Sequence, residues 1–157
     1  MSVYNRFFLQ QDGQLNPRIL ISAGPVLRVE ISVPNSLADL LTRQKRSIPP
    51  PKTGFALIDT GATKSGVDKS AISELGVQPV GITSILTAGG RVEQSLFPAH
   101  FRFPGEGMDI EFSSVLGVDL REHQVNNQPI IALIGRDVLA RLVFIYNGPG
   151  GFFTVAF

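Results

Sequence analysis

One acidic residue, Asp59, stands where a carboxylate can do chemistry. It ends the apolar run Ala56-Leu57-Ile58 and is followed by Thr60 and Gly61. An ionised carboxylate buried without a partner is costly, so such an acid needs a compensating group. A second carboxylate can be that group, because two adjacent acids share one proton and titrate as a unit. The ionised acid can take a proton from an attacking water while the protonated one donates to a carbonyl oxygen.

The same Asp-Thr-Gly sequence has a structural interpretation. Asp, Thr and Gly are favourable turn residues, so Asp59 could simply cap the turn between a strand and a loop. A second segment argues for the chemical interpretation. The run Ala56-Leu57-Ile58 recurs as Ala132-Leu133-Ile134, which ends at Gly135. Two apolar strands therefore end in sharp turns at corresponding places in the chain.

The two segments together resemble the signatures of one enzyme family. Residues 56–62, Ala-Leu-Ile-Asp-Thr-Gly-Ala, look like the active-site loop of retropepsin-type aspartic peptidases. Residues 132–139 look like the second signature of that family, in which two hydrophobic residues and a glycine precede a short helix. From about Val26 to Phe157 the chain is similar to the single-lobed bacterial and cellular members.

The resemblance implies a role for each matching residue. Asp59 would be the catalytic acid and base, Thr60 would hydrogen-bond to the backbone of a partner subunit, and Gly61 would approach the substrate closely. Ala62 would lie beside the substrate. A hairpin would form a flap that closes over the peptide and excludes water; its residues are Thr87, Ala88, Gly89 and Gly90. No cofactor and no metal are expected.

A two-lobed aspartic peptidase carries both acids in one long chain. This chain has a single Asp-Thr-Gly loop, at Asp59, so a homodimer is needed to supply the second carboxylate. A two-fold axis would bring Asp59 against its own copy. The predicted function is therefore an aspartic endopeptidase acting on polypeptides as a homodimer. The alternative is a dimeric adaptor module of the same fold that binds peptides without cleaving them.

One position departs from the viral pattern. Retroviral enzymes carry an acid directly after the loop and pair it with the arginine of the second signature, but here that place is taken by Thr63. Arg136 must then find another partner, for which we consider Asp137 or a backbone carbonyl. The alternative is that Arg136 and Asp137 form a surface ion pair at the start of a helix.

Composition narrows the possible classes of protein. The chain has 157 residues, a net charge of +1 and no cysteine, which disfavours nucleic-acid binding and excludes disulfides and thiolate chemistry. His100 and His123 lie far apart in the sequence, so a metal pair is not expected. No stretch predicts a signal peptide or a membrane span, and we expect a soluble, cytoplasmic protein that does not bind membranes.

Short apolar segments bounded by Gly, Pro or Asn predict an all-β protein with a retropepsin-like closed β-barrel and one or two short helices. One helix is expected after Asp68, ending at Gly76, and one after Gly135. The expected strands are 4–9, 19–22, 26–33, 54–58, 83–87, 92–103, 108–116, 130–134, 143–146 and 152–157.

Residues 1–157 are expected to form a single domain in which residues 34–53 are a loop insertion. That segment contains a small amphipathic piece, a basic stretch and three consecutive prolines, which cannot join a sheet. A mobile surface loop is the simpler interpretation, and a segment for partner binding or self-cleavage is the alternative. Near the C-terminus, Phe152, Phe153 and Phe157 are expected to help build a sheet between subunits.

Overall fold

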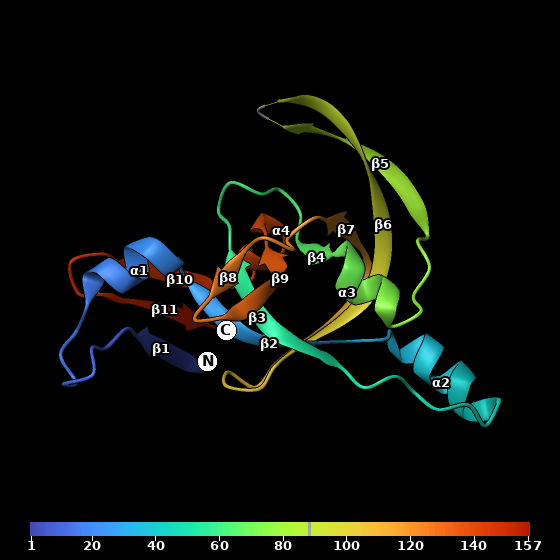
Figure 1. Cartoon of the computed structure of the whole chain (residues 1–157), viewed down its shortest axis with the longest axis horizontal. Coiled ribbons are helices and arrows are strands. Elements are labelled where there is room, and N and C mark those ends of the chain that lie inside the picture. Colours follow the sequence, from blue (N-terminus) through green and yellow to red (C-terminus); the bar gives the residue numbers. More distant parts are fainter. Residues whose placement is uncertain (88) are drawn as a thin grey trace.

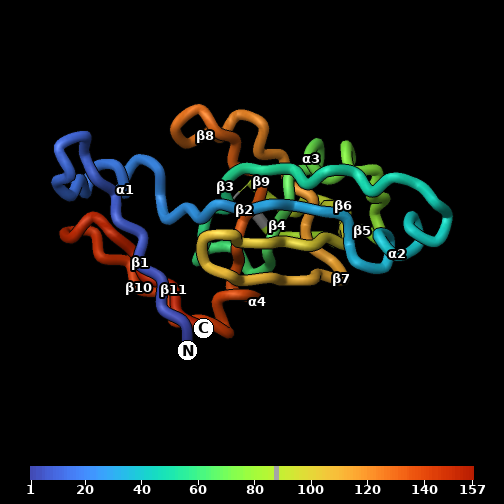
Figure 2. The backbone as a smooth tube through the Cα atoms, turned by 90° about the horizontal axis from the view of Figure 1, so that it is seen from below, coloured from blue at the N-terminus to red at the C-terminus, as the bar shows by residue number. Residues whose placement is uncertain are grey.

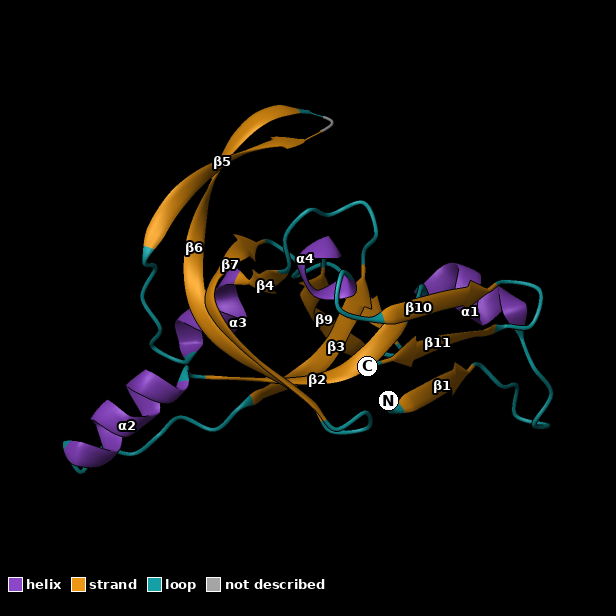
Figure 3. Cartoon of the chain, turned by 180° about the vertical axis from the view of Figure 1, so that it is seen from behind, coloured by secondary structure: helices purple, strands orange, loops and turns teal. Residues whose placement is uncertain are grey.

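The computed structural model describes residues 1–87 and 89–157, and nearly half of them lie in strands (Figure 3). The strands are β1 (Val3–Phe7), β2 (Val26–Ser32), β3 (Lys52–Ile58), β4 (Gly66–Asp68), β5 (Gly81–Thr87), β6 (Gly90–Phe103), β7 (Met108–Val118), β8 (Gln124–Val125), β9 (Gln128–Ile134), β10 (Val143–Asn147) and β11 (Phe152–Ala156). The helices are α1 (Pro17–Ala23), α2 (Asn35–Arg43), α3 (Lys69–Glu74) and α4 (Arg136–Leu139).

Six strands close into a barrel in the order β2-β3-β9-β4-β7-β6, and the pairing of β6 with β2 completes the circle. Alternating residues of β2 and β6 point inward, among them the fully buried Ile31, Phe101 and Phe103. Each such side chain contributes roughly 1.5–3 kcal/mol of hydrophobic stabilisation. The predicted all-β fold with a closed barrel is therefore confirmed.

The hairpin of β5 and β6 extends beyond the barrel. β6 is 14 residues long, and its first half pairs with β5 along the register Gly81↔Leu96 to Thr87↔Gly90, while β7 pairs with β6 from Leu96 onward. The hairpin rises from the barrel and bends over the loop that follows β3 (Figure 1). A long two-stranded element of this kind forms a roof over the barrel end where β3 and β9 finish.

A second, three-stranded sheet joins the two ends of the chain in the order β1-β11-β10 and lies beside the barrel (Figure 2). We expected Phe152, Phe153 and Phe157 to help build a sheet between subunits. This expectation is wrong for the strand β11, which has no free edge to pair with another subunit. β11 is the middle strand, so both of its edges are already paired within one chain. Phe153 is fully buried in the core of its own subunit.

The predicted strand 19–22 is wrong, because these residues form part of helix α1. Asn16 caps the helix by accepting a hydrogen bond from the Arg18 amide (3.1 Å), and Pro17 occupies its first turn. Leu20 is fully buried, so the helix packs against the core through the face that carries this residue. Tertiary packing of a single leucine thus outweighs a short β-like sequence.

The two predicted helices are present as α3 and α4. Asp68 caps α3 by accepting from the Ala71 amide (3.0 Å), and Gly76 ends it with a φ of 75°. Two further helices, α1 and α2, exceed the expected number. Residues 34–53 contain α2, whose Leu41 is buried, so this segment is partly helical rather than a simple loop. The single-domain organisation with an insertion at 34–53 stays a prediction.

Among the helices of the described residues, none has the length and apolar character needed to cross a membrane.

Candidate active site

The repeated tripeptides lie side by side. β3 and β9 pair in parallel with the register Ala56↔Ala132, Leu57↔Leu133 and Ile58↔Ile134. The Asp59 amide then donates to the carbonyl of Ile134 (2.9 Å), so the two chains separate at the same level. The sequence repeat therefore corresponds to one structural feature, a pair of buried strands that deliver the Asp59 loop and the α4 turn to the same end of the barrel.

The Asp59 carboxylate is held by the backbone of its own loop. Its Oδ1 accepts hydrogen bonds from the amides of Gly61 (2.8 Å) and Ala62 (3.2 Å), and the side chain is half-buried. A Cβ on Gly61 would lie 3.1 Å from that oxygen, tighter than most such contacts, so glycine leaves the carboxylate room. Within the described part of the chain, Oδ2 has no hydrogen-bond partner.

Arg136, at the start of α4, ties the Asp59 loop together. Its guanidinium donates to the carbonyls of Thr60 (3.0 Å) and Gly61 (3.3 Å) and to the hydroxyl of Thr63 (2.9 Å). Its backbone amide donates to the carbonyl of Ala62 (2.9 Å). Arg136 thus bonds backbone carbonyls, one of the two partners considered from the sequence. The alternative of a surface ion pair with the neighbouring aspartate is wrong.

Asp137 holds the far end of the same loop. Its carboxylate accepts from the amide (3.0 Å) and the hydroxyl (2.8 Å) of Ser65, which is fully buried. The Ser65 hydroxyl oxygen in turn accepts from the amide of Gly135 (3.0 Å). A Cβ on Gly135 would come within 2.6 Å of the Lys64 carbonyl carbon, so the two segments touch backbone to backbone. Loop and helix are therefore one hydrogen-bonded unit.

A cavity of about 600 Å³ opens above this unit. Its floor includes Asp59, Gly61 and Ala62, and residues 83–86 of β5 line it from the overhanging hairpin. The remaining lining residues are Thr63, Lys64, Gly66, Leu116, Val118 and Leu133. The structure thus brings the predicted Asp59, Gly61 and Ala62 together with one strand of the hairpin. Thr60 lies in the same loop and is exposed.

The predicted hairpin-tip residues do not all line the cavity. The backbone of Thr87 pairs with Gly90, and Gly89 lies in the turn, while Ala88 falls outside the described residues. Gly89 and Gly90 are not among the residues that line the cavity.

Several residues that line the cavity were not predicted. Residues 83–86 directly precede the predicted flap, and the available signal was their place in the predicted strand 83–87. Leu116 and Val118 carry no local signal, because only the pairing of β4 with β7 brings them to the cavity. Lys64 directly follows Thr63 in the Asp59 loop, so its signal was its closeness in sequence to Asp59.

A second polar cluster lies on the barrel wall. The ring of His100 bonds Ser32 Oγ through Nδ1 (3.2 Å) and Asp109 through Nε2. These are the residue types of a hydrolase triad, but the cavity that includes Asp109 includes neither Ser32 nor His100. The cluster therefore has no substrate site at its nucleophile, and we assign it to barrel stability. Within residues 1–87 and 89–157, no three His, Asp or Glu side chains gather closely enough to hold a metal.

The six-stranded barrel, the paired strand ends and the hairpin above Asp59 agree with the fold expected from the sequence. The chain thus has the all-β fold with a closed barrel that the sequence predicted. No protein-family model matches the sequence, and no curated protein matches it either.

Three solved structures are similar to this chain. EIAV protease in complex with the inhibitor HBY-793 is 22% identical, with a TM-score of 0.45 over 74% of this chain and 86% of its own. The simian foamy virus protease is 17% identical, with a TM-score of 0.41 over 73% and 91%. A retropepsin-like aspartic protease from Rickettsia conorii is 16% identical, with a TM-score of 0.47 over 99% and 92%.

Proposed function

We propose that this protein is an aspartic endopeptidase that works as a homodimer, with one Asp59 carboxylate from each subunit. The observation that carries the proposal is the setting of Asp59. Its carboxylate is fixed by two backbone amides on the floor of a largely apolar cavity, beneath a long hairpin. A carboxylate held in this way needs no further side chain to orient it.

The chemistry follows from pairing two such groups. Two carboxylates about 3 Å apart share one proton, so one acts as a base and the other as an acid. The base removes a proton from water, the water oxygen bonds to the peptide carbonyl carbon, and the acid protonates the carbonyl oxygen. Collapse of this intermediate breaks the C–N bond, and the departing nitrogen takes a proton from the carboxyl pair.

The remaining predicted residues have supporting roles in the proposal. Thr60 is exposed beside Asp59, and its carbonyl is already bonded to Arg136, which leaves its hydroxyl for the backbone of the partner subunit. The β5–β6 hairpin acts as the flap, and an extended peptide lies between its strand 83–86 and the loop of Gly61 and Ala62. The backbone of Thr87, Gly89 and Gly90 at the hairpin tip would then reach the substrate when the flap closes.

The terminal sheet supports the dimer. On one of its faces the register aligns Val3 with Val143 across Ala156, and Ile145 lies beside Thr154. The side chains of Val3, Phe7, Val143 and Ile145 are between 47 and 57% exposed. An exposed apolar sheet face of this kind marks an interaction surface, and a two-fold contact through it would cover the same residues in both subunits.

The test compares the wild-type protein with Asp59→Asn on a denatured protein mixture, over a range of enzyme concentrations. We expect cleavage by the wild type alone, with a specific activity that falls on dilution as the dimer dissociates. Cleavage by Asp59→Asn would contradict the mechanism. Peptide binding without cleavage by either protein would favour the dimeric adaptor module instead.

A further inference from the structure

One cation lines the cavity. Of the thirteen residues around it, Asp59 and Lys64 carry charge, and the others are glycine, apolar residues or small hydroxyl residues. Among the described residues that line the cavity, the Lys64 ammonium is the single positive charge that a bound chain would meet. Arg136, the first residue of α4, does not line the cavity, and its guanidinium already donates to the carbonyls of Thr60 and Gly61.

The backbone of Lys64 is fixed on both sides. The carbonyl of Thr63 accepts from the Asp137 amide (3.3 Å), and the amide of Ser65 donates to the Asp137 carboxylate (3.0 Å). Gly135 packs directly against the Lys64 carbonyl. The root of the lysine side chain is therefore set by the same network that positions the catalytic loop, and its position relative to Asp59 is defined.

The Lys64 ammonium has no partner of its own. The residue is exposed, and within residues 1–87 and 89–157 its side chain makes no hydrogen bond or ion pair. Lys52, by contrast, forms an ion pair with Glu74. A lysine left unpaired at the wall of an apolar cleft attracts an acidic side chain of a ligand, and it repels a basic one.

Resting on the proposed function, we infer that Lys64 makes the enzyme selective for peptides that carry an acidic side chain flanked by apolar residues. Two-fold symmetry places a second Lys64 in the same cleft, so an acidic residue is favoured on either side of the bond that is cut. Closing the flap lowers the local dielectric constant and strengthens the attraction. The preference weakens at high salt, since the lysine is reached by solvent.

The experiment uses short peptides of Leu, Val and Phe in which Glu, Gln or Lys stands at each position in turn. Binding to the full-length Asp59→Asn protein is measured by fluorescence anisotropy, and kcat/KM by cleavage with the wild type. At the best position we expect Glu to be favoured over Gln by about fivefold and over Lys by more. Lys64→Glu should invert the order of Glu and Lys in both assays.

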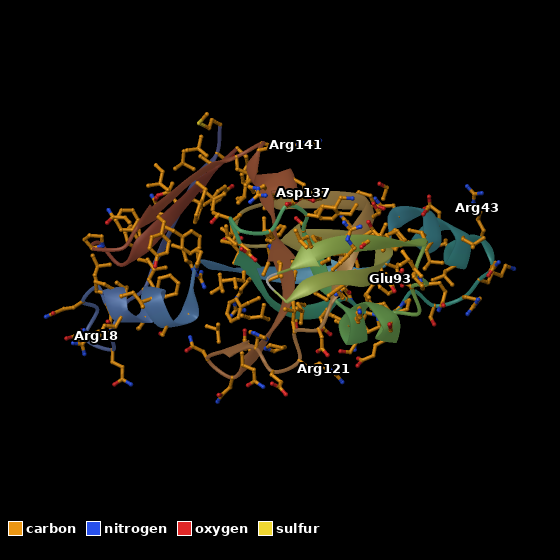
Figure 4. All side chains as sticks on the ribbon, turned by 90° about the horizontal axis from the view of Figure 1, so that it is seen from above. Arg18, Arg43, Glu93, Arg121, Asp137 and Arg141 are labelled. Carbon is orange, nitrogen blue, oxygen red and sulfur yellow. The ribbon has the colours of Figure 1, made fainter. Side chains whose placement is uncertain are left out.

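Arg43→Glu is the matched control, because it makes the same change of charge on an exposed residue at the far end of the molecule (Figure 4). It should leave the peptide preference unchanged. Equal binding of Glu and Lys peptides, or no peptide binding at all, would overturn the inference. So would loss of the dimer in Lys64→Glu, because Lys64 would then be paired across subunits. Charge-selective binding without wild-type cleavage would support this inference while the proposed function fails.

Discussion

Replacing Asp137 with alanine tests whether the bonds between α4 and the catalytic loop hold the site together. The Asp137 carboxylate accepts from the amide and the hydroxyl of Ser65, and Ser65 is fully buried. Val138 also donates to Asp137, but its amide keeps a second acceptor, the carbonyl of Gly135. Alanine therefore leaves two buried donors of Ser65 without a partner.

Each orphaned buried donor costs about 1–3 kcal/mol, so Asp137→Ala should lower the free energy of unfolding by about 3 kcal/mol. For a domain of this size that corresponds to a fall in Tm of roughly 6–12 °C. Asp137→Asn is the matched control. Its amide oxygen can still accept from Ser65, so the expected loss is about 1 kcal/mol.

The assay is urea unfolding followed by circular dichroism, since the chain has no tryptophan. Protein concentration is held constant, because a dimer contributes to the apparent stability. Adding Ser65→Ala to Asp137→Ala should cost a further ~1–3 kcal/mol, because the buried Gly135 amide then loses its acceptor, the Ser65 hydroxyl oxygen. The double variant should still lose less than the sum of the two single variants, because both single variants remove the bond between Ser65 and Asp137. The reasoning is refuted if Asp137→Ala loses less than about 1 kcal/mol or equals Asp137→Asn.

Three further predictions concern other parts of the molecule. Gly135→Ala places a Cβ 2.6 Å from the Lys64 backbone, so it should lower the free energy of unfolding by about 1–3 kcal/mol and reduce peptidase activity. Gly105→Ala, which has open space around it, should match the wild type in both assays. Ile145→Asp should shift sedimentation toward the monomer and abolish cleavage, whereas Leu40→Asp on α2 should remain dimeric. A dimer of Ile145→Asp with unchanged affinity would reject the interface through the terminal sheet. Burial raises the pKa of Glu106 above 4.5, against the opposing charge of Arg6. The folded state therefore binds the Glu106 proton more tightly than the unfolded state does. The stability that this proton contributes is present below about pH 4.5 and is lost as the pH rises through the folded-state pKa. The free energy of unfolding of Glu106→Gln minus that of the wild type, measured in urea, should therefore be larger at pH 7 than at pH 4. An equal difference at both pH values would contradict this.

Local sequence alone predicted much of the framework and the central acid. Strands such as β2 and β9 follow from short apolar runs between turn residues, and α3 follows from the Asp68 cap and Gly76. Asp59 was found because an acid at the end of an apolar strand is chemically conspicuous. These features depend on residues that are neighbours in the chain, where steric and hydrogen-bonding preferences act directly.

The tertiary structure decided everything that depends on contacts between distant residues. The sequence showed that residues 56–58 and 132–134 are alike, but only the parallel register of β3 and β9 made them adjacent. Contacts between segments distant in the chain set the partners of Arg136 and fix the backbone around Lys64 against the α4 turn. The helical state of residues 19–22 goes with the burial of Leu20 in the core. Long-range pairing and burial contribute more free energy than local preference does, so they settle what a short segment leaves open.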